Sequence, residues 1–547
     1  MSQKNIVFYL RNIGYFRNIE WLVQELYSDP SNNLTIILGR FSEKEVKSDH
    51  QIEDDEVLQT QYPRITLQRV SFKVSFGLIE EFIKKFLDYH FFVDAEMSIR
   101  NPAFARVLKH ISKSELFFIK FAEKFPWFIK FAENYSTYMR FDKNITKKVI
   151  RIFSDIQPDL VILTPAVADK SVLILASVLR RIKIPTIGLL ISWDNLTIKG
   201  RFLDVFEKVL IWSVKQGQEL EELHNFRGEN ARIIMEGCYP YAHRMLPNTK
   251  NVKELRHSPS SDFGGISKKI VTWFTSSNFI RNDDVSWQEL ARNVWTKDDV
   301  CKYETEYELI YEFLFQLKSR LQLHNTFQFI IRLHPSDATN ATVVQELQRR
   351  VEREELEEIV FIEKSGNPFG EVRRQIYEIL LDRTSFGIGL ATTSIFELGM
   401  LGKVCFAPPG NLSERSFSKM IHGRYLLQEN GGPVVLSDSW DDFFAKILRA
   451  PENFAPSGVF KELISPELDS NSLQRVKSRI LETTFTSRKE SYSKSLYWIL
   501  RIHLGIVLFS SYLLRNTLLL TKRKFPKKLK RFFKRLNKTL KRRVMKM

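Results

Sequence analysis

Three residues with potential chemistry, Trp193, Asp194 and Asn195, lie in the stretch SWDNLTIKG directly after the apolar run IPTIGLLI. The run is expected to form a strand, so these side chains fall at a strand end, where open α/β sheets bind ligands. A partly desolvated carboxylate at that position can accept a proton, which makes Asp194 a candidate general base. Lys199 could hold a phosphate group. The alternative for Asp194 and Asn195 is an Asx turn that caps the following segment.

A second set of candidate residues follows apolar runs in the later part of the chain. RLHP begins at the end of the run FQFII, where Arg332 offers paired donors for phosphate and His334 can donate a proton to a leaving group. The alternative for His334, which precedes a proline, is a simple turn residue. Ser276 and Ser277, which follow the run IVTWF, supply small hydroxyl groups at the equivalent edge.

The stretch TTSIFELG is the candidate for stabilising negative charge. Ser394 and Glu397 have the spacing of a capping box, which predicts that a helix begins here after the run FGIGLA. The free N–H groups and the positive dipole end of such a helix can bind pyrophosphate, and Thr392, Thr393 and Ser394 add hydroxyl donors. The alternative is a capping box that only prevents fraying of the helix.

The acidic residues and cysteines do not predict a metal or another cofactor. No Asp-x-Asp pair stands out between strands, and Asp283 with Asp284 lies in a polar segment typical of a surface. The three cysteines are widely separated, which fits neither a metal site nor a disulfide framework. We therefore expect a metal-independent site in a reducing, cytoplasmic compartment.

The elements that position these residues alternate between strand and helix. A length of 547 residues exceeds what one core usually supports, and 44% apolar with 27% charged residues is typical of a folded protein. The alternation predicts parallel sheets covered by helices. We expect an α/β protein with two Rossmann-like doubly wound domains at 1–246 and 269–490, joined by a polar linker at 247–268.

The first domain contains an aromatic-rich helical insertion at about residues 76–150. The sequence FIKFAE occurs twice within it, and Phe, Trp and Lys alternate along the predicted helices. Such helices can lie in a membrane interface, with the rings in the acyl boundary and the lysines on headgroups. The alternative is an ordinary insertion that packs on the sheet.

The last segment, residues 491–547, predicts membrane association. Residues 495–520 are apolar, but Arg501, His503 and Arg515 interrupt them, so a helix lying in the membrane plane is favoured over one that crosses it. Residues 522–546 contain 14 Lys or Arg and no acid, with apolar residues at helical spacing. The net charge of +18 therefore belongs mostly to this tail.

An anionic membrane is the expected partner of the tail. Nucleic acid would attract the same charge, but the apolar stripe has no use against a phosphodiester backbone, so no specific nucleic-acid partner is expected. The apolar run at the N-terminus is too short for a signal peptide. Together these features predict a cytoplasmic protein, peripheral or monotopic at the inner face of the cell membrane.

Four motifs carry a resemblance to a known family: SWDNLTIKG, VLIWSVKQGQELEELH, IIRLHP and TTSIFELGMLGKVCF. They resemble GT-B glycosyltransferases of bacterial surface polysaccharide biosynthesis and, distantly, CDP-glycerol glycerophosphotransferases. The resemblance covers residues 5–487. It implies transfer of a sugar from a nucleotide-sugar donor, bound by the second domain, to a lipid-linked or polysaccharide acceptor, bound by the first.

Two departures from these families qualify the reaction. Glycerophosphotransferases carry a Trp-His-Gly pattern, whereas Trp193 is followed here by Asp194, which argues against polyol-phosphate chemistry. The first loop, RNIGYFRN, has one glycine and no histidine, although many GT-B enzymes have both a glycine-rich loop and a histidine there. The alternatives are a CDP-polyol phosphotransferase of teichoic-acid type and a non-catalytic GT-B-like scaffold for polysaccharide assembly.

Overall fold

The computed structural model describes most of the two predicted domains. The described residues are 3–11, 13–40, 56, 58–71, 78–94, 104, 107–108, 110–136, 143–167, 169–224, 226, 232–235, 268–276, 306–338, 340–365, 371–451, 453–465 and 471–485. The predicted linker lies outside them except for Lys268, and so do Ser277 and the predicted membrane tail at 491–547.

The first domain is built on a seven-stranded parallel sheet with the order β3-β2-β1-β4-β5-β6-β7. Its strands are β1 (Lys4–Leu10), β2 (Asn32–Arg40), β3 (Thr66–Ser71), β4 (Leu160–Thr164), β5 (Thr186–Leu189), β6 (Lys208–Ile211) and β7 (Ile233–Met235). The covering helices include α1 (Glu20–Tyr27), α7 (Lys143–Ile156), α8 (Lys170–Arg181), α9 (Asn195–Ile198) and α10 (Val214–Glu222). Runs such as LVILT are buried along their whole length, because helices cover both faces of the sheet.

The second domain repeats this design with a six-stranded parallel sheet in the order β10-β9-β8-β11-β12-β13. Its strands are β8 (Lys269–Phe274), β9 (Phe327–Arg332), β10 (Val360–Glu363), β11 (Thr384–Gly389), β12 (Val404–Phe406) and β13 (Val434–Val435). The helices used below are α14 (Glu306–Lys318), α16 (Pro335–Ala338), α18 (Glu371–Arg383), α19 (Thr393–Met400), α20 (Asn411–Phe417), α21 (Ile421–Tyr425), α22 (Trp440–Arg449) and α23 (Gly458–Ile464).

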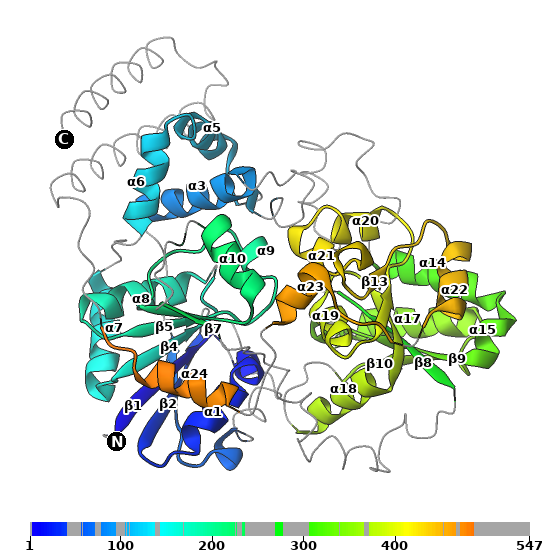
Figure 1. The fold of residues 1–547 in the computed structure, drawn as a ribbon, viewed down its shortest axis with the longest axis horizontal. Helices are drawn as coiled ribbons and strands as arrows, with labels where there is room; N and C mark the ends of the chain where they lie inside the picture. The colour runs from blue at the N-terminus through cyan, green and yellow to red at the C-terminus, as the bar shows by residue number, and fades with distance from the viewer. Residues whose placement is uncertain are drawn as a thin grey trace, which may run out of the picture.

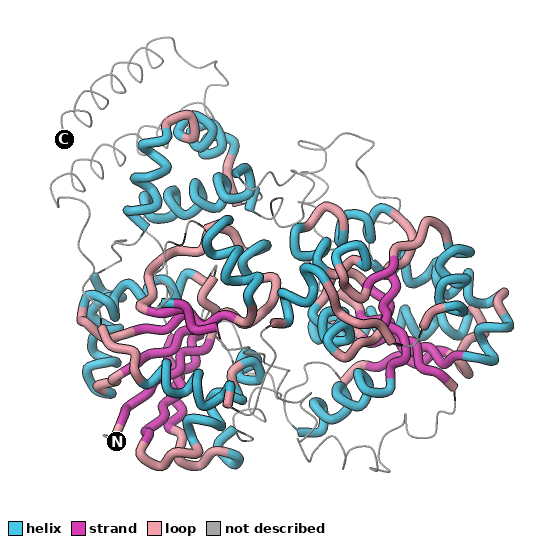
Figure 2. The backbone as a smooth tube through the Cα atoms, viewed as in Figure 1, coloured by secondary structure: helices cyan, strands magenta, loops and turns pink. Residues whose placement is uncertain are grey.

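Both sheets have the strand order of a Rossmann fold, in which the chain starts in the middle and reverses direction once. Figure 2 shows each sheet enclosed by helices, and Figure 1 shows the two domains side by side. The predicted fold class, two doubly wound α/β domains in a GT-B arrangement, is confirmed.

The aromatic insertion forms a helical layer of its own at one end of the first domain (Figure 1). It consists mainly of α3 (Leu78–Asp94), α5 (Lys113–Ala122) and α6 (Pro126–Ser136). Most of its rings are buried, as in the edge-to-face contact of Phe86 with Phe128, whose centroids lie 4.9 Å apart. The insertion and one face of the first sheet share a single hydrophobic core. No helix among the described residues is long and apolar enough to cross a bilayer.

The last described helix, α24 (Ser472–Leu481), corrects the predicted domain boundary. Val476 and Ile480 pack in the first-domain core beside α1, and Lys208 Nζ donates to the carbonyl of Arg479 at 2.9 Å. The predicted second domain at 269–490 therefore includes a helix that belongs to the first. The apolar spacing of α24 shows that one face is buried, but it does not show which domain covers that face.

Candidate functional site

The loop that follows β5 carries the predicted residues 193–195. Its backbone is held by side chains from two sequence motifs, SWDNLTIKG and VLIWSVKQGQELEELH. Three hydrogen bonds fix it: Trp212 Nε1 donates to Leu190 O at 2.7 Å, Ile191 N donates to Asn195 Oδ1 at 3.1 Å, and Gln216 Nε2 donates to Ser192 O at 3.1 Å. SWDNLTIKG and VLIWSVKQGQELEELH are thus parts of one structural unit, and the buried Asn195 supports the loop.

Asp194 lies at the N-cap position of α9 and makes no side-chain cap bond there. Its carboxylate is half-buried, and Asn195 Nδ2 donates to Asp194 Oδ1 over 3.5 Å. The Asp194 carboxylate does not cap α9, so the Asx-turn alternative does not describe Asp194. Lys199 follows α9 and is also half-buried.

Trp193 joins the loop to the second domain. Its ring stacks on Phe396 of α19 with centroids 5.2 Å apart and an interplanar angle of 7°. The ring of His422 on α21 meets it edge to face, also at 5.2 Å. Only 1% of Trp193 is exposed. Two further contacts between the domains are the bond from Val214 N to Ser465 O, at 3.0 Å, and the ion pair between Arg374 and Glu20, also at 3.0 Å.

His422 is a candidate site residue that the sequence did not reveal. It is 2% exposed, and Nδ1 has no hydrogen-bond partner among the residues that the structure describes. Burial lowers the pKa of His422 to about 4, although the charge of Asp194 opposes this shift and that of Lys199 adds to it. The imidazole is therefore neutral at neutral pH. Its segment, KMIHGRY, has no feature that separates it from an ordinary short helix.

The start of α19 differs from the predicted capping box. Thr392 is the N-cap, with extended backbone angles, and makes no side-chain cap bond, while Thr393 begins the helix. Ser394 is already inside the first turn, where its hydroxyl lies 3.0 Å from Tyr377 Oη. Glu397 is fully buried and accepts a hydrogen bond from the same Tyr377 hydroxyl. The capping-box prediction was therefore wrong. The helix begins before Ser394, and the Ser394 hydroxyl and the Glu397 carboxylate both bond to Tyr377 of α18.

The ends of β8 and β9 are tied together beside His334. His334 N donates to Thr275 Oγ1 at 2.7 Å, and Thr275 N donates to Arg332 O at 3.0 Å. The His334 carbonyl accepts from Asp337 N at 2.8 Å and so helps to form the first turn of α16. His334 is half-buried directly after β9, as its place after FQFII predicted.

Ser276 and Arg332 are engaged with carboxylates that the sequence did not connect to them. Ser276 N donates to Glu306 Oε2 at 2.7 Å, and its hydroxyl bonds the same oxygen. Arg332 is buried in an ion pair with Glu363, and its guanidinium lies 4.7 Å from the centroid of the Tyr377 ring. Tyr377 thus lies between Arg332 and the start of α19.

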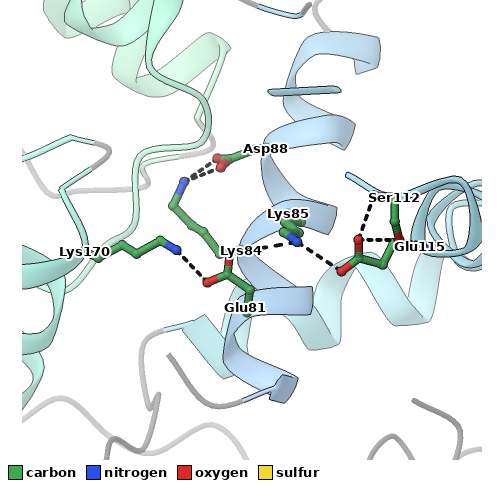
Figure 3. Close-up of polar contacts among 7 residues, drawn as sticks. All are labelled: Glu81, Lys84, Lys85, Asp88, Ser112, Glu115 and Lys170. Atoms are coloured by element: carbon green, nitrogen blue, oxygen red, sulfur yellow. Dashed lines mark hydrogen bonds and ion pairs between the residues drawn. The ribbon is translucent and has the colours of Figure 1, made fainter. Parts of the chain in front are cut away.

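The insertion holds the far end of SWDNLTIKG. Asp88 of α3 accepts from Arg201 N at 2.9 Å and from Lys84 Nζ at 2.6 Å; Figure 3 shows the Lys84 contact. Gly200 has φ +83°, and a Cβ there would lie 2.3 Å from Asp88 Oδ1. Only glycine fits this close approach, so the motif must end in Gly200 for Asp88 to reach Arg201.

His224 is a second link between the insertion and this loop. Its Nδ1 accepts from Phe202 N at 3.0 Å, so Nε2 carries the proton and donates to Leu196 O at 2.8 Å. The ring stacks on Phe91 of α3 with centroids 4.8 Å apart. Burial lowers the pKa of His224 to about 3, which keeps the ring neutral. Both its nitrogens are used, so we assign it a structural role.

Glu219 of α10 faces Tyr425 of α21 across the domain contact. Burial raises the pKa of Glu219 to about 8, although the neighbouring Tyr425 hydroxyl and the charge of Lys215 oppose that shift. The carboxyl is protonated at neutral pH. In the unfolded chain the same group releases its proton near pH 4.5. The native state therefore loses stability as pH rises from 4.5 through 8, because the unfolded state ionises first.

The loss of stability as the pH rises can be tested with a variant of Glu219. The melting temperature of Glu219→Gln should fall less than that of the wild type between pH 4.5 and 8, and the difference should correspond to at most about 1.4 kcal/mol per pH unit. Differential scanning fluorimetry of both proteins measures it. His422, with its lowered pKa, should cost both proteins the same stability as pH falls from 6.5 through 4. Parallel curves above pH 4.5 would contradict the assignment of Glu219.

Buried polar atoms around the domain contact that have no hydrogen-bond partner among the described residues include Trp193 Nε1, Thr392 Oγ1, Ser413 Oγ, His422 Nδ1 and both carboxyl oxygens of Glu219. The loop before α19 is fixed to α20 by the bond from Ala391 N to Ser416 Oγ, at 2.9 Å, which brings α20 beside Thr392. Within the described part of the chain, no group of three or more His, Cys, Asp or Glu could hold a metal ion.

The fold and these residues define a two-domain protein of GT-B architecture whose candidate site lies where the two domains meet. No protein-family model matches the sequence, and no curated protein matches it. Solved structures resemble it over most of its length at low identity.

Three of these solved structures show how low the similarity is. The UDP complex of MnaA from S. aureus is 8% identical, with a TM-score of 0.45 over 87% of this chain and 96% of that one. UDP-GlcNAc 2-epimerase from Methanocaldococcus jannaschii is 12% identical, with a TM-score of 0.45 over 87% and 98%. A glycosyltransferase from Rickettsia africae is 10% identical, with a TM-score of 0.40 over 92% and 98%. Similarity at this level assigns no activity to the chain.

Proposed function

We propose that this chain is a nucleotide-sugar glycosyltransferase of GT-B architecture that acts where its two domains meet. One observation carries the proposal: Trp193, Thr392, Ser413 and His422 each bury a polar atom there without a hydrogen-bond partner among the described residues. Buried polar atoms of folded proteins are nearly always paired. A nucleotide sugar carries hydroxyl and phosphate oxygens that can serve as partners for all four side chains.

The nucleotide diphosphate of the donor is proposed to bind at the start of α19. Thr392, Thr393 and Ser394 offer hydroxyl and backbone N–H groups there, and the positive end of the helix dipole favours the charge that develops on the leaving group. His334, at the end of the neighbouring β9, is the candidate donor of a proton or hydrogen bond. Arg332, whose charge is paired with Glu363, supports this part of the site by its contact with Tyr377, which binds Ser394 and Glu397 of α19.

The acceptor is proposed to bind the first domain, with Asp194 as the base that removes the proton from its hydroxyl. Asp194 is half-buried and follows Trp193, whose ring meets that of His422 edge to face, so Asp194 and His422 belong to segments that meet at the domain contact. Lys199 of the same loop would contact the acceptor or a phosphate, whereas the buried Trp193 ring holds the loop against the second domain. This gives the reaction a base on one domain and charge stabilisation on the other.

The acceptor is further proposed to be a lipid-linked or growing surface glycan at the cytoplasmic face of the membrane. This part rests on the sequence of the tail, where an apolar segment at 495–520 precedes 14 Lys or Arg at 522–546. Each basic residue near an anionic leaflet contributes about 1 kcal/mol before screening and crowding reduce it. Deleting residues 521–547 should therefore release the protein from membranes at moderate salt.

Nucleotide binding tests the proposal directly. We expect at least one nucleoside diphosphate among UDP, GDP, CDP and dTDP to raise the melting temperature of the purified chain, since a ligand at a hundredfold excess over its Kd stabilises by about 2.7 kcal/mol. Thr392→Val should weaken this shift because it removes a buried hydroxyl group at the proposed site. A panel in which no nucleotide stabilises the protein would contradict the enzyme assignment.

The released nucleotide separates the alternatives. Sugar transfer from a nucleoside diphosphate sugar releases the diphosphate, whereas a CDP-polyol phosphotransferase releases CMP. A scaffold would bind neither donor, and cellular glycan would survive His334→Ala and Asp194→Ala but not loss of the tail.

A further inference from the structure

Helix α5 exposes two phenylalanine side chains on one face. Phe117 is 58% exposed and Phe121 is 42% exposed, and their spacing of four residues places them side by side on the helix. Phe121 also contacts Phe125 edge to face, with centroids 5.2 Å apart, and Phe117 contacts Phe118 in the same way at 5.6 Å. The exposed rings are therefore the outer part of a larger aromatic cluster.

The exposed charged residues beside these rings are lysines, whereas the acidic residues of the segment are only partly exposed. Lys120 and Lys124 are exposed on the same segment, and Lys130 is exposed on α6. The acidic residues of α5 point elsewhere: Figure 3 shows Glu115 bonded to Ser112 and to Lys85 of α3, the latter at 3.0 Å. Glu123 lies 3.4 Å from His90 Nδ1. The outer surface thus combines aromatic rings with cations, while its carboxylates are held against α3.

Helix α5 lies at the periphery of the described part of the chain. Figure 1 shows α5 at the outer end of the insertion, away from the contact between the two domains. Exposed large apolar residues elsewhere, such as Phe315 and Phe361, lie singly on different elements. Single exposed rings are ordinary on protein surfaces, whereas a cluster rimmed by polar groups marks an interaction site.

We infer that the α5 face, formed by Phe117, Lys120, Phe121 and Lys124, docks on an anionic lipid surface. Charge complementarity selects this partner: lipid phosphates can pair with the lysines while the acyl boundary accepts the rings. A symmetric dimer through this face would place lysine against lysine. The inference depends neither on sugar transfer nor on the tail, because it concerns a folded surface of the first domain.

Hydrogen exchange of the full-length protein tests the inference locally, whatever the tail contributes. Vesicles of phosphatidylglycerol mixed with phosphatidylcholine should slow exchange of amides at 113–125, and vesicles of phosphatidylcholine alone should not. Peptides of α14 that contain Phe315, which is 55% exposed, serve as the internal control and should not change. Unchanged exchange at 113–125 would overturn the inference. So would protection that grows with protein concentration without vesicles, since it would indicate a second copy instead.

Variants of the full chain provide a second measurement by vesicle flotation. Phe117→Ser with Phe121→Ser should weaken partitioning about tenfold, since two apolar side chains no longer reach the acyl boundary. Lys120→Gln and Lys124→Gln should each weaken it roughly fivefold at low salt. Phe315→Ser is the matched control and should bind like the wild type. Equal binding of the double phenylalanine variant and this control would refute a role for the α5 face.

Discussion

Replacing Asp194 with asparagine is expected to lower the rate of sugar transfer by about 10²- to 10⁴-fold, the usual contribution of a positioned general base. The substitution preserves the size of the side chain and an oxygen that can still accept from Asn195 Nδ2. It also leaves untouched the three hydrogen bonds that fix the loop backbone, because none of them uses Asp194. The melting temperature should therefore stay close to that of the wild type, and the loss should appear in kcat.

The measurement uses the donor whose nucleotide stabilises the protein, with release of that nucleotide as the readout. Asp438→Asn is the matched control, because Asp438 is an exposed carboxylate of the second domain, ahead of α22. It should keep full activity. A rate for Asp194→Asn within a few fold of the wild type would show that another group removes the proton. His422→Gln would then be the next variant, since His422 is the neighbouring group with an unpartnered nitrogen among the described residues.

The sequence predicted the fold because the sheets of this protein are buried on both faces. Continuous apolar runs such as IPTIGLLI and FQFII contain parallel strands, and their ends place Asp194 in the loop after β5 and His334 just after β9. Strand ends can be read from local sequence, since an apolar run stops where burial stops. The position of these residues was therefore predictable, whereas their hydrogen-bond partners were not.

The remaining features of the site depend on contacts between segments far apart in the chain. His422 and Glu219 acquire their perturbed pKa values only because the domains bury them. The capping box failed for a similar reason: Ser394 and Glu397 have the correct spacing, but Tyr377 of a different helix binds both. Helix α24 has an amphipathic pattern that fits either domain equally well. Local patterns do not specify which surface a buried group meets.

Asp88→Ala is expected to destabilise the first domain by about 3–5 kcal/mol, since it leaves the ammonium group of Lys84 buried without its carboxylate. Lys84 is 6% exposed and lies within the helix–helix contacts of the insertion, as Figure 3 shows for its bond to Asp88. The substitution also removes the acceptor of Arg201 N, next to the end of the loop that carries Asp194. Chemical denaturation followed by circular dichroism measures the loss.

A double-mutant cycle separates the charge from the hydrogen bond. Asp88→Asn should also destabilise, because Lys84 stays charged, whereas Lys84→Met combined with Asp88→Asn should recover most of the stability. The combined variant removes both charges and keeps an oxygen for Arg201 N. Asp442→Asn provides the control for a pair of the same spacing that is more exposed, between Asp442 and Lys446 on α22, and should cost only about 0.2–1 kcal/mol. If the Asp88 and Lys84 changes were simply additive, the buried pair would not be coupled, and the insertion would hold the loop at 192–200 by the Arg201 bond and packing alone.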